Sequence, residues 1–158
     1  VHKTGGGNNT SFYNLYIRKG DNYSLEHSSS MVFSHSGDTL FIGAMLPKDI
    51  TLTCPSLEEI NSTGFNVYLN DVSTPRLLVH SGPGTETVFR NTNIQSLSYT
   101  GEVNNAMSMY DDNKLDTVKV RLGKGSALKF EDATYHVADI VVDSLRELRI
   151  SGKALNSL

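Results

Sequence analysis

The sequence predicts an all-β domain, an antiparallel β-sandwich of the jelly-roll type, and three features of the chain favour this class. Apolar and polar residues alternate with a period of two over many short stretches, which is typical of half-buried strands. Clusters of glycine, asparagine, aspartate and serine separate these stretches every ten residues or so, as in sandwiches and barrels. Helical periodicity is confined to two short windows.

The expected strands follow from this alternation. Residues 38–46 place Leu40 and Ile42 on one face of a strand, with Phe41 on the other face. The same pattern marks further strands, in chain order, at residues 14–20, 28–37, 49–54, 64–71, 76–80, 87–99, 116–123 and 126–132. The stretch 87–99 is long enough for one strand or two.

In two segments the sequence leaves the choice between helix and strand open. Residues 55–60, PSLEEI, begin with proline and serine and carry acidic residues in the first turn, which suits a short helix. Residues 137–150 fit both periods, and the Ile-Val-Val run favours a strand followed by a turn or a short helix. No clean repeat is evident, although apolar triplets in the last third of the chain allow a C-terminal β-solenoid-like segment.

Length and composition set the organisation. The 158 residues fit one β-rich domain over residues 12–158, with a subdivision near 111–116 as the alternative, after a Gly/Asn-rich flexible linker over residues 1–11. That linker suggests a domain taken from a longer protein. The net charge of −3 predicts no nucleic-acid partner, and no apolar run is long enough for membrane insertion. The single cysteine, Cys54, is expected in the core.

A loop at residues 110–116, YDDNKLD, offers the weak candidate for a metal site. Asp111, Asn113 and Asp116 carry oxygen ligands of the kind that calcium prefers. The central glycine and distant glutamate of a calcium loop are absent, and the same residues are standard in turns. We therefore predict no cofactor, with calcium as the alternative.

Candidate binding residues gather in the middle of the chain. Tyrosine beside asparagine, aspartate and serine on a rigid β-surface suits contacts with sugar rings or with protein. The predicted binding residues are Tyr99, Glu102, Asn104, Tyr110, Asp111, Asp112 and Asn113. No catalytic residue is predicted. A glycan-degrading fragment is the alternative, with Glu86, Glu102, Asp111 and Asp112 as its carboxylates.

In overall texture the chain resembles a domain of a bacteriophage tail fibre or tailspike. The resemblance lies in the Gly/Asn-rich start, the short alternating strands and a surface dominated by serine, threonine and asparagine. It does not extend to the self-cleaving tailspike chaperones, which resemble each other in a Ser-Asp start. The resemblance implies a homotrimeric, extracellular virion module that binds host-surface polysaccharide or protein. A secreted carbohydrate-binding or adhesin module is a further alternative.

Such a trimer needs an apolar contact surface. In residues 38–46 both faces of the expected strand are apolar, because Phe41 and Met45 alternate with inward residues. A neighbouring subunit would cover this second face.

Overall fold

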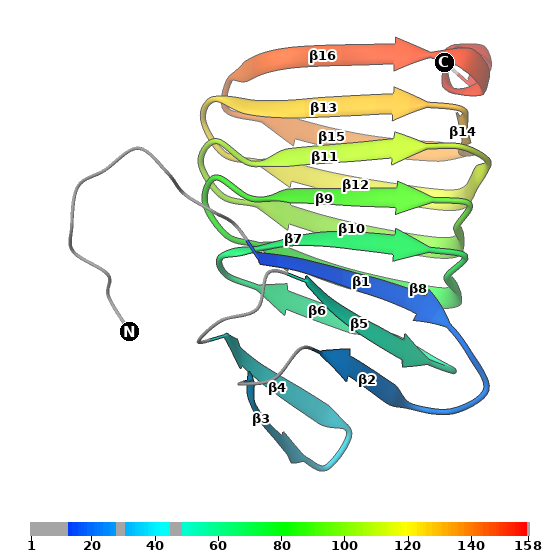
Figure 1. Ribbon diagram of the computed structural model, residues 1–158. Helices are drawn as coiled ribbons and strands as arrows, with labels where there is room; N and C mark the ends of the chain where they lie inside the picture. The colour runs from blue at the N-terminus through cyan, green and yellow to red at the C-terminus, as the bar shows by residue number, and fades with distance from the viewer. Residues whose placement is uncertain (1–12, 28–30, 45–48, 158) are drawn as a thin grey trace.

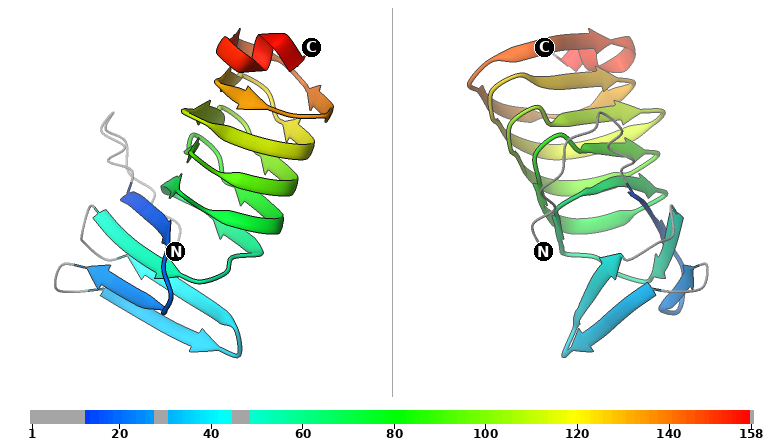
Figure 2. Two further views of the ribbon diagram at one scale, coloured as in Figure 1. Left: turned by 90° about the vertical axis from the view of Figure 1, so that its right-hand side faces the viewer. Right: turned by 60° about the vertical axis from the view of Figure 1, so that its left-hand side comes forward.

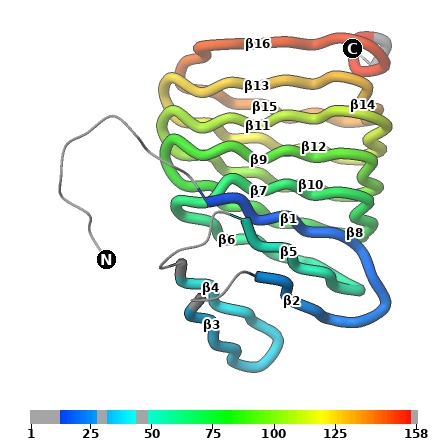
Figure 3. The backbone as a smooth tube through the Cα atoms, in the orientation of Figure 1, coloured from blue at the N-terminus to red at the C-terminus, as the bar shows by residue number. Residues whose placement is uncertain are grey.

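The computed structural model describes residues 13–27, 31–44 and 49–157 (Figure 1). The described residues are mostly strand and form a β-solenoid of about five turns, here called coils. Each coil contributes one strand to each of two facing sheets, and the strands of successive coils lie side by side and parallel (Figures 1 and 3).

The larger sheet, here called sheet A, holds eight strands in the order β16-β13-β11-β9-β7-β1-β5-β2. Its strands are β1 (Tyr13–Lys19), β2 (Ser24–His27), β5 (Asp49–Cys54), β7 (Phe65–Asn70), β9 (Glu86–Arg90), β11 (Ala106–Tyr110), β13 (Ser126–Glu131) and β16 (Leu145–Ser151).

The second sheet, here called sheet C, holds β6 (Glu59–Ser62), β8 (Ser73–Ser81), β10 (Asn93–Gly101), β12 (Asn113–Leu122) and β14 (Ala133–Thr134). A further strand, β15 (Val137–Val142), pairs with β12 beyond β14. The hairpin β3 (Met31–Ser36) and β4 (Thr39–Ala44) lies apart from both sheets, and a short 3-10 helix, η1 (Gly152–Ser157), follows β16.

The core lies between the sheets and consists of columns of inward side chains, one from each coil. In sheet A one column holds Ile50, Leu15, Val67, Thr87, Met107, Leu128 and Leu148. In sheet C one column holds Ile60, Val79, Tyr99, Val120 and Ile140. Because the register is kept from coil to coil, each inward side chain of an inner coil is covered by its equivalent in the next coil.

At the corner that leads from sheet A to sheet C, the backbone adopts the left-handed conformation once per coil. The residues are Asp71, Asn91, Asp111, Asp132 and Gly152, with φ angles of 58°, 51°, 65°, 53° and 59°. Asparagine and aspartate tolerate this conformation better than other side chains, because their short polar groups bond to nearby backbone. This series, here called the Asx corner, keeps the coils in register.

The corner that leads back from sheet C to sheet A, here called the glycine corner, has its own left-handed series. The residues are Gly64, Gly84, Asn104 and Gly125. Backbone hydrogen bonds tie the turns together, as from Gly82 N to Ser62 O at 2.7 Å and from Gly123 N to Gly101 O at 2.9 Å.

The N-terminal segment completes one end of the solenoid. β1 lies between β5 and β7 and is parallel to both, and β2 returns antiparallel along the outer side of β5. Figure 2 shows the β3–β4 hairpin beyond this end of the stack. Leu25, Ile42 and Leu57 pack against the buried core there.

The all-β prediction is confirmed, and so is a solenoid at the C-terminal part, but the antiparallel arrangement of a jelly roll is wrong for both sheets. Within them only β2 pairs antiparallel. The solenoid also begins much earlier than the last third of the chain. The expectation that the chain has no clean repeat is wrong, because equivalent residues recur every 20 or 21 positions, as in Leu69, Phe89 and Met109.

The structure assigns the two segments whose secondary structure the sequence left open. Residues 55–60 form no helix, since β6 starts at Glu59, whereas residues 137–150 form β15 and most of β16 around a turn. Cys54 is buried as expected. The subdivision near 111–116 falls on a corner inside the solenoid, and residues 1–11 and Met45 lie outside the described residues.

Candidate functional site

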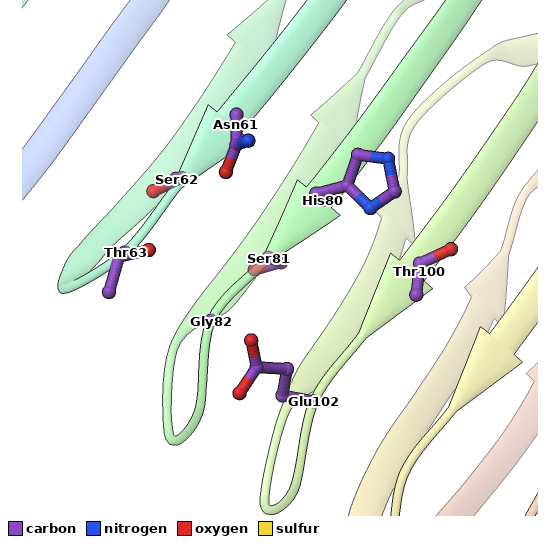
Figure 4. A pocket seen from close by; sticks show the side chains of 8 residues that line it. All are labelled: Asn61, Ser62, Thr63, His80, Ser81, Gly82, Thr100 and Glu102. Atoms are coloured by element: carbon purple, nitrogen blue, oxygen red, sulfur yellow. The ribbon is translucent and has the colours of Figure 1, made fainter.

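Two shallow hollows lie next to each other where the strands of sheet C end at the glycine corner. The first is lined by Asn61, Ser62, Thr63, His80, Ser81, Gly82, Thr100 and Glu102 (Figure 4). The second is lined by Thr100, Gly101, Arg121, Leu122, Gly123, Val141 and Asp143. They share Thr100, so together they form one surface, here called the corner groove, that crosses β6, β8, β10, β12 and β15.

The register of sheet C places the polar side chains of this groove in one row. Asn61 is the partner of His80, His80 of Thr100, and Thr100 of Arg121, each in the next coil. All four side chains are exposed on the outer face of the sheet. Neighbouring strands are spaced ~4.8 Å apart, so the row offers one polar group per coil along the solenoid axis.

Two side chains of opposite charge belong to the groove. Arg121 is held by Asp139 in a two-pronged ion pair, with Nη2 2.7 Å from Oδ2 and Nη1 3.2 Å from Oδ1. This contact, chiefly its hydrogen bonds, keeps the pKa of Asp139 below its ordinary value. Glu102 lies on the other side of Thr100, and its carboxylate projects beside Gly82 (Figure 4). The groove therefore combines a fixed cation, an imidazole, hydroxyl groups and a carboxylate.

Gly82 gives the first hollow its floor. A side chain there would stand 3.2 Å from Ser62 O and from the Cα atom of Thr63, both parts of the preceding turn. The backbone of neighbouring coils therefore approaches closely, and the polar side chains rise around the contact.

Two of the predicted binding residues are inside the protein. The Tyr99 ring belongs to the core, and its hydroxyl lies 2.6 Å from Asn105 Oδ1. Burial raises the pKa of Tyr99 to about 12. The Asn113 side chain fills the Asx corner, where Oδ1 accepts from Thr92 N at 3.1 Å and Nδ2 donates to Tyr110 O at 2.7 Å. Both side chains are buried and form hydrogen bonds within the fold.

The other five predicted binding residues are divided between the two corners. Glu102 and Asn104 lie at the glycine corner, and only Glu102 lines the corner groove. Tyr110, Asp111 and Asp112 lie at the Asx corner, at the opposite ends of the strands. The structure therefore does not bring the predicted set together. His80 and Asn61 are not among the predicted residues, because they belong to no local motif and meet Glu102 only through the parallel register.

The three oxygen ligands of the weak metal candidate also diverge. The Asn113 oxygen is bonded inside the corner, and Asp116 Oδ1 lies 3.4 Å from His136 Nδ1. Asp112, next to Asp111, receives a 2.6 Å hydrogen bond from Lys153 Nζ, which lowers the pKa of its carboxyl. Among the described residues, no group of three or more histidine, cysteine, aspartate or glutamate side chains could hold a metal ion.

The carboxylates proposed for a glycan-degrading enzyme occupy three separate places. Glu86 lies on the outer face of sheet A, where Ser108 Oγ donates to its Oε1 at 3.0 Å. Glu102 lies on the sheet C side of the glycine corner, and Asp111 and Asp112 lie at the Asx corner. Glycosidase chemistry needs two carboxylates flanking one bond. This set provides no such pair.

Several tyrosines gather instead on the outer face of sheet A. Tyr16 and Tyr68 are stacked at a centroid distance of 5.0 Å, and Arg90 lies 5.7 Å from the centroid of the Tyr110 ring. These rings are half-buried, and they already use their faces on neighbours in the sheet. The face is thus less free for a ligand than the corner groove.

Comparison with known proteins finds no family model that matches the sequence and no matching curated protein. In the part of the chain that the structure describes, no helix is long and apolar enough to cross a membrane.

Proposed function

We propose that the chain is a non-catalytic binding module of a bacteriophage tail fibre or tailspike, located in the virion, and that the corner groove binds host-surface glycan. The observation that carries this proposal is the row Asn61, His80, Thr100 and Arg121, one polar side chain from each of four successive coils. A glycan chain lying along the solenoid axis would meet a new hydrogen-bonding group at every coil.

The chemistry of the groove supports a polyhydroxylated ligand. Sugar hydroxyls both donate and accept hydrogen bonds, and the groove offers a carboxylate at Glu102, hydroxyls at Thr63 and Thr100, and an amide at Asn61. The hollows are shallow and open, which suits an extended chain better than a small enclosed molecule. A rigid stack of coils also holds these groups in place before binding, which reduces the entropy lost.

Binding to an array of bacterial surface glycans tests the proposal, followed by titration of the best ligand. We expect His80→Ala and Glu102→Gln each to weaken binding by about tenfold, since each removes a hydrogen bond to the ligand. Ser96→Ala is the matched control, because Ser96 is exposed on the same face outside both hollows. Wild-type protein that binds no glycan, or a control as weak as the two variants, would contradict the proposal.

The proposal includes a homotrimer that forms through the β3–β4 hairpin. Val32 and Phe41, which are 60% and 54% exposed, lie on one face of the hairpin, and Phe33, which is 51% exposed, lies on the other face. This apolar surface would otherwise face water. Light scattering should give the mass of three chains or a multiple of it, and Phe41→Ser should abolish this threefold association. Wild-type protein that is a monomer at a concentration on the order of tens of micromolar would contradict the trimer.

A further inference from the structure

The C-terminal end of the solenoid exposes the interior of its last coil. Inward residues Ile140 and Leu148 are 38% and 56% exposed, whereas Val120 and Leu128, one coil earlier in the same columns, are 0% and 1% exposed. The last coil therefore has the shape and chemistry of an inner coil whose next neighbour is missing.

Both strands of that coil also have a free edge. β15 pairs only with β12, and β16 pairs only with β13, so among the described residues no strand accepts the backbone bonds on their outer side. Exposed edges are normally protected by proline, by inward charge or by a very short strand. Neither strand has a proline or an inward charge, and the only irregularity is a bulge at the start of β16.

We propose that this end binds the same end of a second copy of the chain. β15 and β16 run in opposite directions because they belong to the two sheets of one coil (Figure 1). A second copy turned through half a turn, about an axis parallel to the strands, brings its β16 antiparallel to the first copy's β15. The interface is then isologous, and Ile140 and Leu148 of each copy cover those of the other.

Charge supports this arrangement. Asp143 and Arg146 are exposed at the glycine corner, one after β15 and the other near the start of β16, and neither forms an ion pair with another described residue. In the proposed pairing each Asp143 faces the partner copy's equivalent of Arg146, so two complementary pairs form at the rim.

The other charges of the last coil are already paired within the chain and do not oppose docking. Asp139 binds Arg121, while Glu147 binds Lys129 at 3.1 Å and Arg149 binds Glu131 at 3.3 Å, all on the outer faces. The central part of the end is therefore apolar, and only its rim carries free charge.

Sedimentation of the full chain over a range of concentrations, up to about 200 µM, tests the inference. We expect Leu148→Arg to halve the mass that wild-type protein reaches, and Phe41→Ser at the opposite end to leave end-to-end pairing intact. Because Leu148 is more than half exposed, this substitution leaves the fold in place, and circular dichroism verifies it.

A charge exchange tests the geometry. Asp143→Arg and Arg146→Glu should each weaken the pairing by about tenfold, and the double variant should restore it. A wild-type mass that Leu148→Arg does not change, or a double variant as weak as the single ones, would overturn the inference. Either result would leave glycan binding at the corner groove untouched, because that groove is assayed separately.

Discussion

The two ends of the solenoid differ, although the same columns of side chains run through both. In the sheet A column, Ile50 at the N-terminal end is 0% exposed and Leu148 at the C-terminal end is 56% exposed. Leu25, Ile42 and Leu57, which come from β2, from the hairpin and from the segment before β6, pack at the N-terminal end. η1 covers only part of the other end, where Ala154 is buried.

This difference shows that the repeat that forms the coils does not by itself cover the end of the stack. Inner coils are covered by their own repeat, whereas an end needs a segment with a different path, such as antiparallel β2. The exposed end keeps the repeat geometry and so can accept another strand pair. Among the described residues, one end of the solenoid is thus covered, and the other keeps open strand edges.

The largest difference in stability should appear when an isoleucine is replaced by alanine at each end in turn. Ile50→Ala removes a fully buried side chain and should lower the free energy of unfolding by about 3–4 kcal/mol. Ile140→Ala, in a side chain 38% exposed, should cost about 1 kcal/mol in the monomer. Urea denaturation at low protein concentration measures both. Equal losses would show that the two ends are equally covered.

High pH tests whether the coils between the ends form one tightly packed interior. Burial raises the pKa of Tyr99 to about 12, above its ordinary value of 10.0. Stability from the neutral phenol is therefore complete below pH 10 and is lost as the pH rises toward 12, by about 2–3 kcal/mol. Denaturation at several pH values should show this loss, and Tyr99→Phe should show less of it. An identical pH dependence in both proteins would contradict a buried Tyr99.

The Asx corner can be tested at its buried amide. Asn113→Ala should cost about 2 kcal/mol, because the carbonyl groups of Phe89 and Tyr110 and the amide of Thr92 lose their partner. Asn104→Ala is the control. Asn104 is exposed at the other corner, so its replacement should lower stability only through the strain of alanine at a positive φ. Thermal denaturation compares the two, and a larger loss for Asn104→Ala would refute the role given to Asn113.

The smallest effect concerns how η1 is held at the exposed end. Hydrogen bonding from Lys153 lowers the pKa of Asp112 from its ordinary 3.8, so the contact stabilises the protein above that value and is lost as the pH falls below it. Both groups are exposed, so the effect should be small and should vanish in high salt. Lys153→Met should remove it. A melting temperature of Lys153→Met that falls as much in acid as that of the wild type would contradict this role.

The sequence predicted most of the strands, because alternation reports which residues of a strand face inward, but it did not predict β2, β6 or β11. It could not report which strands are neighbours, so parallel coils were read as an antiparallel sandwich. The repeat was hidden because Val67, Thr87, Met107 and Leu128 fill equivalent positions with different chemistry. The repeat could have been found from the Asx series, since Asp71, Asn91 and Asp111 are 20 residues apart. One extra residue at the 111–113 corner makes the next spacing, to Asp132, 21 residues.

The residues of the corner groove were harder to predict for a related reason. Tyr99 and Asn113 stand in polar stretches that suggested surface, but the solenoid interior satisfies them with Asn105 and Thr92. Glu102 was predicted because its loop is polar, whereas His80 and Asn61 join it only through pairing between coils. The sequence around each of these residues does not indicate which strands pair.

Hydrogen exchange at two protein concentrations tests the difference between the ends most directly. At low concentration, amides of β1 and β11 should exchange slowly and those of β15 and β16 quickly, and at high concentration β15 and β16 should become protected. Strands β15 and β16 that are as protected as β11 in dilute solution, or that never gain protection, would contradict the account.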